Sequence, residues 1–120
     1  MAVRTGPSNP HVRSLITKLQ EKSRSEGVAL WRRIATDLNK PSRQRRSVNV
    51  YRIDQTAREG ETVIVPGKVL SSGELTKPLD VAALSFSESA FKKINAKGKA
   101  LTISELLEKN PKGSKVRIVG

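Results

Sequence analysis

The most concentrated chemistry in this sequence is positive charge between Lys40 and Arg52. The stretch holds five basic residues and no acidic one: Lys40, Arg43, Arg45, Arg46 and Arg52. An arginine guanidinium can donate two parallel hydrogen bonds to phosphate oxygens, and cations held this close repel one another unless an anion neutralises them. These residue types at this spacing predict contact with a polyanion, with a solvated charged loop as the alternative.

The charge excess extends over the whole chain. Its 120 residues include 23 Lys and Arg against 11 Asp and Glu, for a formal net charge of +12. The aromatic residues are few: Trp31, Tyr51, Phe86 and Phe91. Modules that read single strands by stacking need several exposed rings. The composition therefore favours a nucleic-acid binder that works through phosphate and shape contacts, built on an aliphatic core.

Catalysis and metal binding find little support in the sequence. The chain has no cysteine and a single histidine, His11, so neither a thiolate site nor a histidine-based metal site can be assembled. The first residues lack the apolar run of a signal peptide, and no stretch approaches the roughly 20 apolar residues of a membrane span. We expect a soluble, cytoplasmic protein with no enzymatic activity, no cofactor or metal, no small-molecule substrate and no membrane partner.

Two helices are predicted after a flexible basic arm over residues 1–9. Asn9-Pro10 matches an N-cap followed by proline at the first helical position, and apolar residues then recur on one helical face over about 10–24. A second apolar stripe runs over 31–38 and stops before a proline. The two helices should form a hairpin over 10–40 with its cations directed outward.

The chain changes character after a basic linker over residues 40–47. Alternating, β-branched sequence replaces the helical periodicity, and Pro66-Gly67 interrupts it. Extended segments are predicted over 48–53, 62–65, 68–71, 79–84 and 115–119.

Two further helices are predicted from their capping residues. Ser85 with Glu88 forms one capping box, which opens a helix over 86–96 that ends at Gly98. Thr102 with Glu105 forms a second box, and a short helix with an apolar side follows it.

These elements predict a mixed α/β fold class, with an N-terminal helical hairpin followed by a small domain of irregular strand-strand-helix units. Residues 10–120 should form a single domain. It would consist of the hairpin (10–40), the basic linker (40–47) and a mixed α/β part (48–120).

Three places outside the linker are candidates for phosphate contact. The outward face of the hairpin carries Arg13 and Arg33, the latter at the spacing of an ion pair with Asp37. The glycine-containing turn at 67–73 offers a lysine and two serines, and the predicted helix over 86–96 has amides at its start and lysines toward its end. For each place, an ordinary solvated surface is the simpler alternative.

The sequence from Gly67 to Ile94, GKVLSSGELTKPLDVAALSFSESAFKKI, and the GKALT that begins at Gly98 resemble a ribosomal protein family. The family is the archaeal and eukaryotic L-eighteen-e family of the large subunit, which is related to the bacterial large-subunit protein L-fifteen. The resemblance covers nearly the whole chain, including SVNVYRI from Ser47 and PKGS from Pro111. The compact length resembles the archaeal members.

This resemblance implies a structural protein of the large ribosomal subunit that binds large-subunit ribosomal RNA beside neighbouring ribosomal proteins and supports assembly and translation. By position, it implies RNA-facing segments at the arm with Arg4, the linker, the turn over 68–72 and Lys77. The candidate RNA-binding residues are then Arg4, Arg13, Arg33, Lys40, Arg43, Arg45, Arg46, Asn49, Arg52, Lys68, Ser71, Ser72, Lys77, Lys97 and Lys99. A free-standing basic nucleic-acid-binding or chromatin-type interaction protein is the alternative.

Overall fold

The computed structural model describes residues 10–39 and 47–119, so the predicted arm and most of the basic linker lie outside the described residues. The elements in chain order are α1 (Pro10–Glu26), α2 (Ala29–Leu38), β1 (Ser47–Asn49), α3 (Val50–Thr56), β2 (Thr62–Leu70), β3 (Asp80–Phe86), α4 (Glu88–Lys97), β4 (Lys99–Thr102), α5 (Ile103–Lys109) and β5 (Val116–Ile118). This is the mixed α/β class that the sequence predicts, with the helical hairpin at its start.

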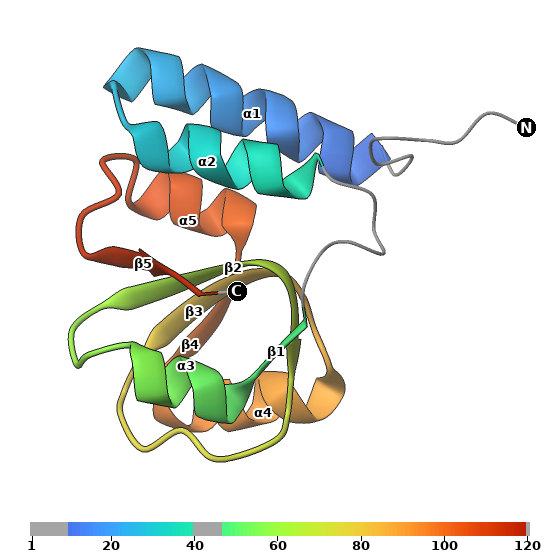
Figure 1. Ribbon diagram of the computed structural model, residues 1–120, viewed down its shortest axis with the longest axis vertical. Coiled ribbons are helices and arrows are strands. Elements are labelled where there is room, and N and C mark those ends of the chain that lie inside the picture. The colour runs from blue at the N-terminus through green and yellow to red at the C-terminus, as the bar shows by residue number, and fades with distance from the viewer. Residues whose placement is uncertain (1–9, 40–46, 120) are drawn as a thin grey trace, which may run out of the picture.

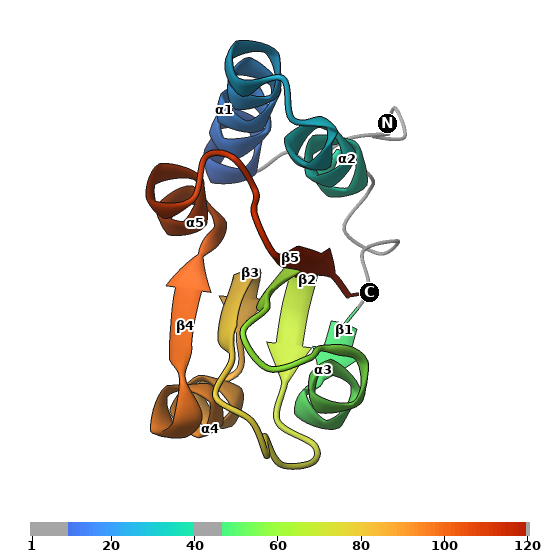
Figure 2. The same ribbon diagram turned by 90° about the vertical axis from the view of Figure 1, so that its left-hand side faces the viewer.

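The sheet is built around β2, and every strand pairing in the described part is parallel. The order is β1-β2-β3-β4. Because β3 occupies one edge of β2, β5 and β1 share the other edge, with β5 beside residues 62–64 and β1 beside residues 68–70. Figure 1 and Figure 2 show α1, α2 and α5 on one face of the sheet and α3 and α4 on the other. The two-sided cover is what a parallel sheet requires.

An aliphatic core lies on each face of the sheet. Alternation along β2 sends Ile64 into the core shared with α1, α2 and α5, and sends Val63 and Val65 into the core shared with α3 and α4. Trp31 is fully buried in the first core. The hairpin is therefore packed against the same strands that α3 and α4 cover from the other side.

The loop between α5 and β5 fastens the hairpin to the rest of the molecule. The Trp31 indole Nε1 donates a hydrogen bond of 2.7 Å to the Pro111 carbonyl. Lys112 Nζ lies 2.9 Å from a carboxylate oxygen of Glu26 at the end of α1. Gly113 has φ +68 and packs so closely on Leu30 that a Cβ there would lie 2.9 Å from its Cδ2. The positive φ favours glycine at this position.

The predicted strand over 48–53 is wrong beyond Asn49. Helix α3 begins at Val50, because Val50, Ile53 and Ala57 are buried at the spacing of one helical face while Tyr51 is exposed. The first apolar residues of this run fit either a strand or a helix. Only the burial of Ile53 and Ala57 distinguishes the helical period of about 3.6 residues from the strand period of about two.

Pro66-Gly67 does not separate two strands as predicted. Strand β2 continues to Leu70, and its pairing with β3 shifts register between Val65 and Lys68. A bulge is the place where a strand tolerates proline, which has no N–H to donate to its neighbour.

Helix α4 begins two residues later than predicted, and Ser87 rather than Ser85 is its N-cap. The Ser87 Oγ accepts a 3.2 Å hydrogen bond from the Ala90 N–H, whereas Ser85 belongs to β3. The predicted end at Gly98 is confirmed, since its N–H donates to the Ile94 carbonyl at 2.7 Å. A Cβ on Gly98 would lie 2.0 Å from the Leu79 carbonyl oxygen, so a side chain does not fit there.

The second predicted capping box is confirmed. The Glu105 N–H donates to Thr102 Oγ1 at 3.1 Å, and the Thr102 N–H donates to Glu105 Oε1 at 3.0 Å. Helix α1 extends to Glu26, two residues beyond its predicted end, and α2 buries the predicted stripe from Trp31 to Leu38.

Candidate nucleic-acid interface

Toward the end of the sheet where β2 and β3 end, β1, β2 and β3 each contribute one residue to an exposed polar row. Ser47, Lys68 and Ser85 are in register across the three strands, and all three are exposed. In the next row, Val48 and Val69 are buried in the core with α3 and α4. Since successive side chains alternate between faces, Ser47 and Lys68 lie on the opposite face, where no helix covers them.

We group Arg52 with this row because it follows β1 closely in the sequence, and we call the four residues the strand-end surface: Ser47, Arg52, Lys68 and Ser85. Arg52 is exposed in the first turn of α3, directly after β1. The start of α1, with exposed Arg13, and the end of α2 lie on the same side of the molecule as β1 (Figure 1). The described residues that border the basic linker, Asn39 and Ser47, therefore both lie on this side.

The turn after β2 is held by backbone contacts with the start of α3. The Tyr51 N–H donates to the Ser72 carbonyl at 3.0 Å, and the Ser72 N–H donates to Asn49 Oδ1 at 3.3 Å. Gly73, with φ +93, packs directly on Tyr51, where a Cβ would lie 2.4 Å from the Tyr51 Cβ. These contacts use the side-chain oxygen of Asn49 and the backbone of Ser72, and they leave the Ser72 side chain exposed.

Two lysines fasten the connection between β2 and β3 to the neighbouring helices through backbone carbonyls. Lys93 Nζ on α4 donates to the carbonyls of Ser71 and Gly73, each at 2.8 Å. Lys77 Nζ donates to the Asp54 carbonyl and, at 2.8 Å, to the Ala57 carbonyl at the end of α3. Nothing in the local sequence marks Lys93 for this role, because its partners lie about twenty residues away.

The Asp54 carboxylate is a further anchor of the turn. Its Oδ1 accepts hydrogen bonds from the Thr76 N–H at 2.8 Å and from Thr76 Oγ1 at 2.9 Å. Burial acts to raise the pKa of Asp54, but the hydrogen bonds from Thr76 and the charge of Lys77 outweigh it and lower the pKa below its ordinary value. The turn is therefore held in one shape by the protein itself.

The structure does not bring all the described candidate residues together. Lys99 pairs with Asp80, the first residue of β3, whereas Lys68 pairs with Ser85 near the end of β3. Lys97 ends α4 two residues before Lys99 begins β4, so the exposed Lys97 and Lys99 lie at the opposite end of the sheet from the strand-end surface. The candidates Arg4, Lys40, Arg43, Arg45 and Arg46 lie outside the described residues.

Acidic residues pair with cations at both ends of the sheet, and Glu74 lies 3.3 Å from Lys93 Nζ beside the turn after β2. Three ion pairs lie at the end where β2 and β3 begin, which we call the strand-start end: Arg117 with Glu61 at 2.9 Å, Lys112 with Glu26 at 2.9 Å and Lys109 with Asp80 at 4.0 Å. Hydrogen bonds from Arg117 hold the pKa of Glu61 below its ordinary value. Arg33 on α2 has the predicted partner, Asp37, at 3.5 Å. Within the residues described, Arg52 and Lys68 form no ion pair.

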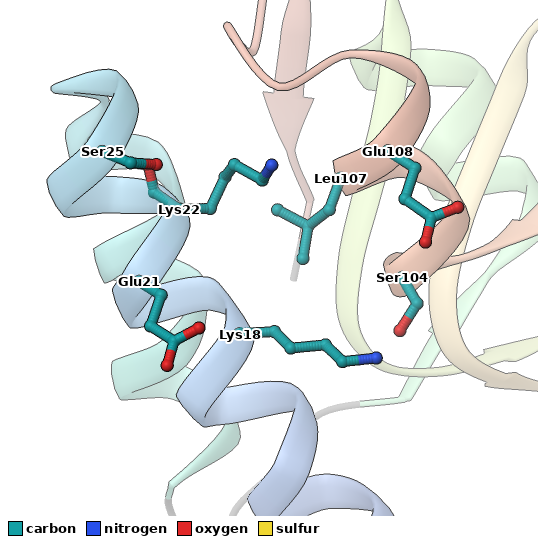
Figure 3. A pocket seen from close by; sticks show the side chains of 7 residues that line it. All are labelled: Lys18, Glu21, Lys22, Ser25, Ser104, Leu107 and Glu108. Atoms are coloured by element: carbon teal, nitrogen blue, oxygen red, sulfur yellow. The ribbon is translucent and has the colours of Figure 1, made fainter.

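A groove between α1 and α5, with a volume of about 400 Å³, lies away from the strand-end surface. Figure 3 shows its lining, which combines Lys18, Glu21 and Lys22 of α1 with Leu107 and Glu108 of α5. Cations and carboxylates are equally represented, so this groove lacks the single sign of charge that favours a polyphosphate.

Residues 10–39 and 47–119 contain neither a cluster of metal ligands nor a helix that could span a membrane. No group of three or more histidine or acidic side chains there is placed to hold a metal ion. No helix in those ranges has both the length and the apolar character needed to cross a membrane.

Comparison with known proteins defines the class and then the family. Residues 30–102 match a family model described as ribosomal proteins 50S-L15 and 50S-L18e with a 60S member. The chain is 50% identical over 120 residues to the large ribosomal subunit protein eL18 of Methanosphaerula palustris, with 99% of each chain covered. Identity is 49% to eL18 of Methanopyrus kandleri, covering 96% of this chain and 95% of the relative, and 46% to eL18 of Haloarcula marismortui, covering 93% and 97%.

The chain belongs to the eL18 family of large ribosomal subunit proteins. This confirms the resemblance seen in the sequence, including its archaeal character. It does not favour the alternative of a free-standing chromatin-type protein.

Proposed function

We propose that this protein is a structural constituent of the archaeal large ribosomal subunit, located in the cytoplasmic ribosome, and that it binds large-subunit ribosomal RNA. The observation that carries the proposal is the strand-end surface, where Arg52 and Lys68 are exposed without acidic partners in the described part. Family membership supplies the setting, because the relatives are named as large-subunit proteins. Neighbouring ribosomal proteins are further partners in this proposal.

The strand-end surface has the chemistry of a phosphate-binding site. Arg52 and Lys68 supply charge, and the hydroxyls of Ser47 and Ser85 can donate hydrogen bonds to phosphate oxygens on either side of Lys68. The anchored turn presents Ser71 and Ser72 next to this row without needing to become ordered on binding, which lowers the entropic cost of association. The linker arginines, which directly precede Ser47 in the sequence, are further RNA-binding residues in this proposal.

The remaining candidates have different parts in this proposal. Lys97 and Lys99 contact a second RNA segment at the strand-start end, so that the domain bridges two segments. Arg4 and Arg13 are further RNA-binding residues in this proposal, while Arg33 forms an ion pair with Asp37. We assign Lys77 to positioning the turn, because its ammonium already donates to two carbonyls of α3.

The proposal is tested by binding of the purified protein to large-subunit ribosomal RNA. Equal masses of an unrelated structured RNA and of duplex DNA serve as competitors across a salt series. If about six phosphates are neutralised, affinity should fall roughly 10³-fold between 50 and 200 mM salt, while the preference for ribosomal RNA persists. Equal binding to all three nucleic acids that disappears together at higher salt would contradict the proposal.

A further inference from the structure

Two aromatic rings remain exposed at the end of the sheet that carries the strand-end surface. Tyr51 and Phe91 are the large hydrophobic side chains that are exposed in the described part, each at 48%. Tyr51 directly precedes Arg52 in α3, and Phe91 lies in the first turns of α4, which follows β3. Of the chain's four aromatic residues, Trp31 is fully buried and Phe86 is partly buried. The other two, Tyr51 and Phe91, are exposed to solvent here.

Local contacts hold both rings in place. The backbone of Tyr51 is bonded to Ser72 and packed on by Gly73. Phe91 meets Phe86 edge to face, with ring centroids 6.0 Å apart and planes at 68°. Their positions on either side of the Ser87 cap are those of a hydrophobic staple, which explains this contact but not the exposed remainder of the Phe91 ring.

The surroundings of the rings decide between an apolar partner and a nucleotide. Each ring is followed in sequence by an exposed cation, Arg52 after Tyr51 and Lys92 after Phe91, although Lys92 also has Glu88 at 3.6 Å. An apolar protein surface would have to bury these charges without compensation. A nucleotide offers a flat base to the ring and a phosphate to the cation beside it.

We infer that Tyr51 and Phe91 are stacking platforms for unpaired bases of the RNA. Bases inside a duplex have both faces covered by their neighbours, so the bases that can reach these rings belong to loops, bulges or strand ends. The turn after β2 is bonded to α3 through Tyr51 and to α4 through Lys93, and the two rings belong to different helices, so each ring takes a separate base. This inference rests on the proposed function and names the form of RNA that the strand-end surface recognises. It adds a contact that the low aromatic content of the sequence argued against.

The experiment compares two short RNA hairpins of equal charge, one carrying two unpaired adenosines in its stem and one fully paired. Affinities are measured for the wild-type protein, for Tyr51→Leu and Phe91→Leu, and for the ring-retaining controls Tyr51→Phe and Phe91→Tyr. Leucine keeps an apolar side chain for the staple, and melting curves confirm that each variant folds. We expect each leucine variant to lose about tenfold or more in affinity for the hairpin with unpaired bases and little for the paired one. The ring-retaining variants should match the wild type.

Three results would overturn the inference in distinguishable ways. Equal wild-type affinity for the two hairpins, or leucine variants that keep the wild-type preference, would remove the stacking role while leaving ribosomal RNA binding intact. A wild-type protein that fails to prefer ribosomal RNA over duplex DNA would instead remove the proposed function, and the stacking role with it.

Discussion

The two ends of the sheet contain the same kinds of charged residue, but the charges have different partners. At the strand-start end, Arg117 and Lys112 are matched with Glu61 and Glu26, and the Trp31 indole is bonded to the loop that carries Lys112. On the strand-end surface, Lys68 has no such partner in the part of the chain that the structure describes. The comparison shows that a cation's role here depends on the acids and carbonyls around it rather than on how many cations are near it in sequence.

The largest expected effect tests whether the strand-start end joins the hairpin to the sheet. Trp31→Ala removes a fully buried side chain and its 2.7 Å hydrogen bond to Pro111, so we expect a loss of about 3–5 kcal/mol in the free energy of unfolding. We further predict a single transition in urea, followed by circular dichroism, because residues of the hairpin and of the sheet share one core. Two separate transitions would show that the hairpin and the mixed part are independent domains.

A smaller effect is expected from a lysine that holds the turn. Lys77→Met keeps the length of the side chain but removes both hydrogen bonds to the carbonyls of α3, which should cost about 1–3 kcal/mol in the free energy of unfolding. Lys97→Met, at an exposed position, is the control and should change that free energy by less than about 0.5 kcal/mol. If the two substitutions changed the free energy of unfolding equally, the Lys77 ammonium would not hold the carbonyls of α3 in solution.

The second proposed RNA contact can be separated from the first by its salt dependence. Lys97→Ala/Lys99→Ala should leave the free energy of unfolding nearly unchanged. It should reduce the slope of log affinity against log salt by about two for ribosomal RNA, if each lysine neutralises one phosphate. An unchanged slope would confine the RNA surface to the other end of the sheet.

The smallest effect concerns the pH dependence of the turn. The pKa of Asp54 is lowered from its usual value of 3.8, so its contribution to stability is complete above that value and is lost as the pH falls through the folded-state pKa. The carboxylate is partly exposed, so we expect at most about 1 kcal/mol. The difference in unfolding free energy between the wild type and Asp54→Asn should shrink below about pH 4 in denaturation series. A difference that is constant from pH 7 to pH 3 would contradict this.

Elements with strong local signals are predictable from the sequence. The stripe from Trp31 to Leu38 and the box formed by Thr102 and Glu105 are set by contacts three or four residues apart, and both are confirmed. Helix α3 could not be predicted in this way, because Val48 and Val50 suit a strand as well as a helix. The sharing of one edge of β2 by β1 and β5 has no local signal at all.

The candidate site was predictable in its residue types but not in its arrangement. Lys68 was identified beside a glycine, yet only the parallel register places Ser47 and Ser85 on either side of it. The structural roles of Lys77 and Lys93 depend on partners about twenty residues away, which neither charge nor spacing reveals. Pairing distant segments is a property of the fold, whereas sequence patterns report on neighbours.

The most direct test of the account is a comparison of two charge-matched double variants binding large-subunit ribosomal RNA across a salt series. Arg52→Ala/Lys68→Ala removes two cations of the strand-end surface, and Lys109→Ala/Lys112→Ala removes two cations paired with acids at the strand-start end. We predict that the first loses about tenfold or more in affinity, with a slope smaller by about two, and that the second stays close to the wild type. Equal losses in the two variants would show that total charge alone governs binding, and would contradict a dedicated surface.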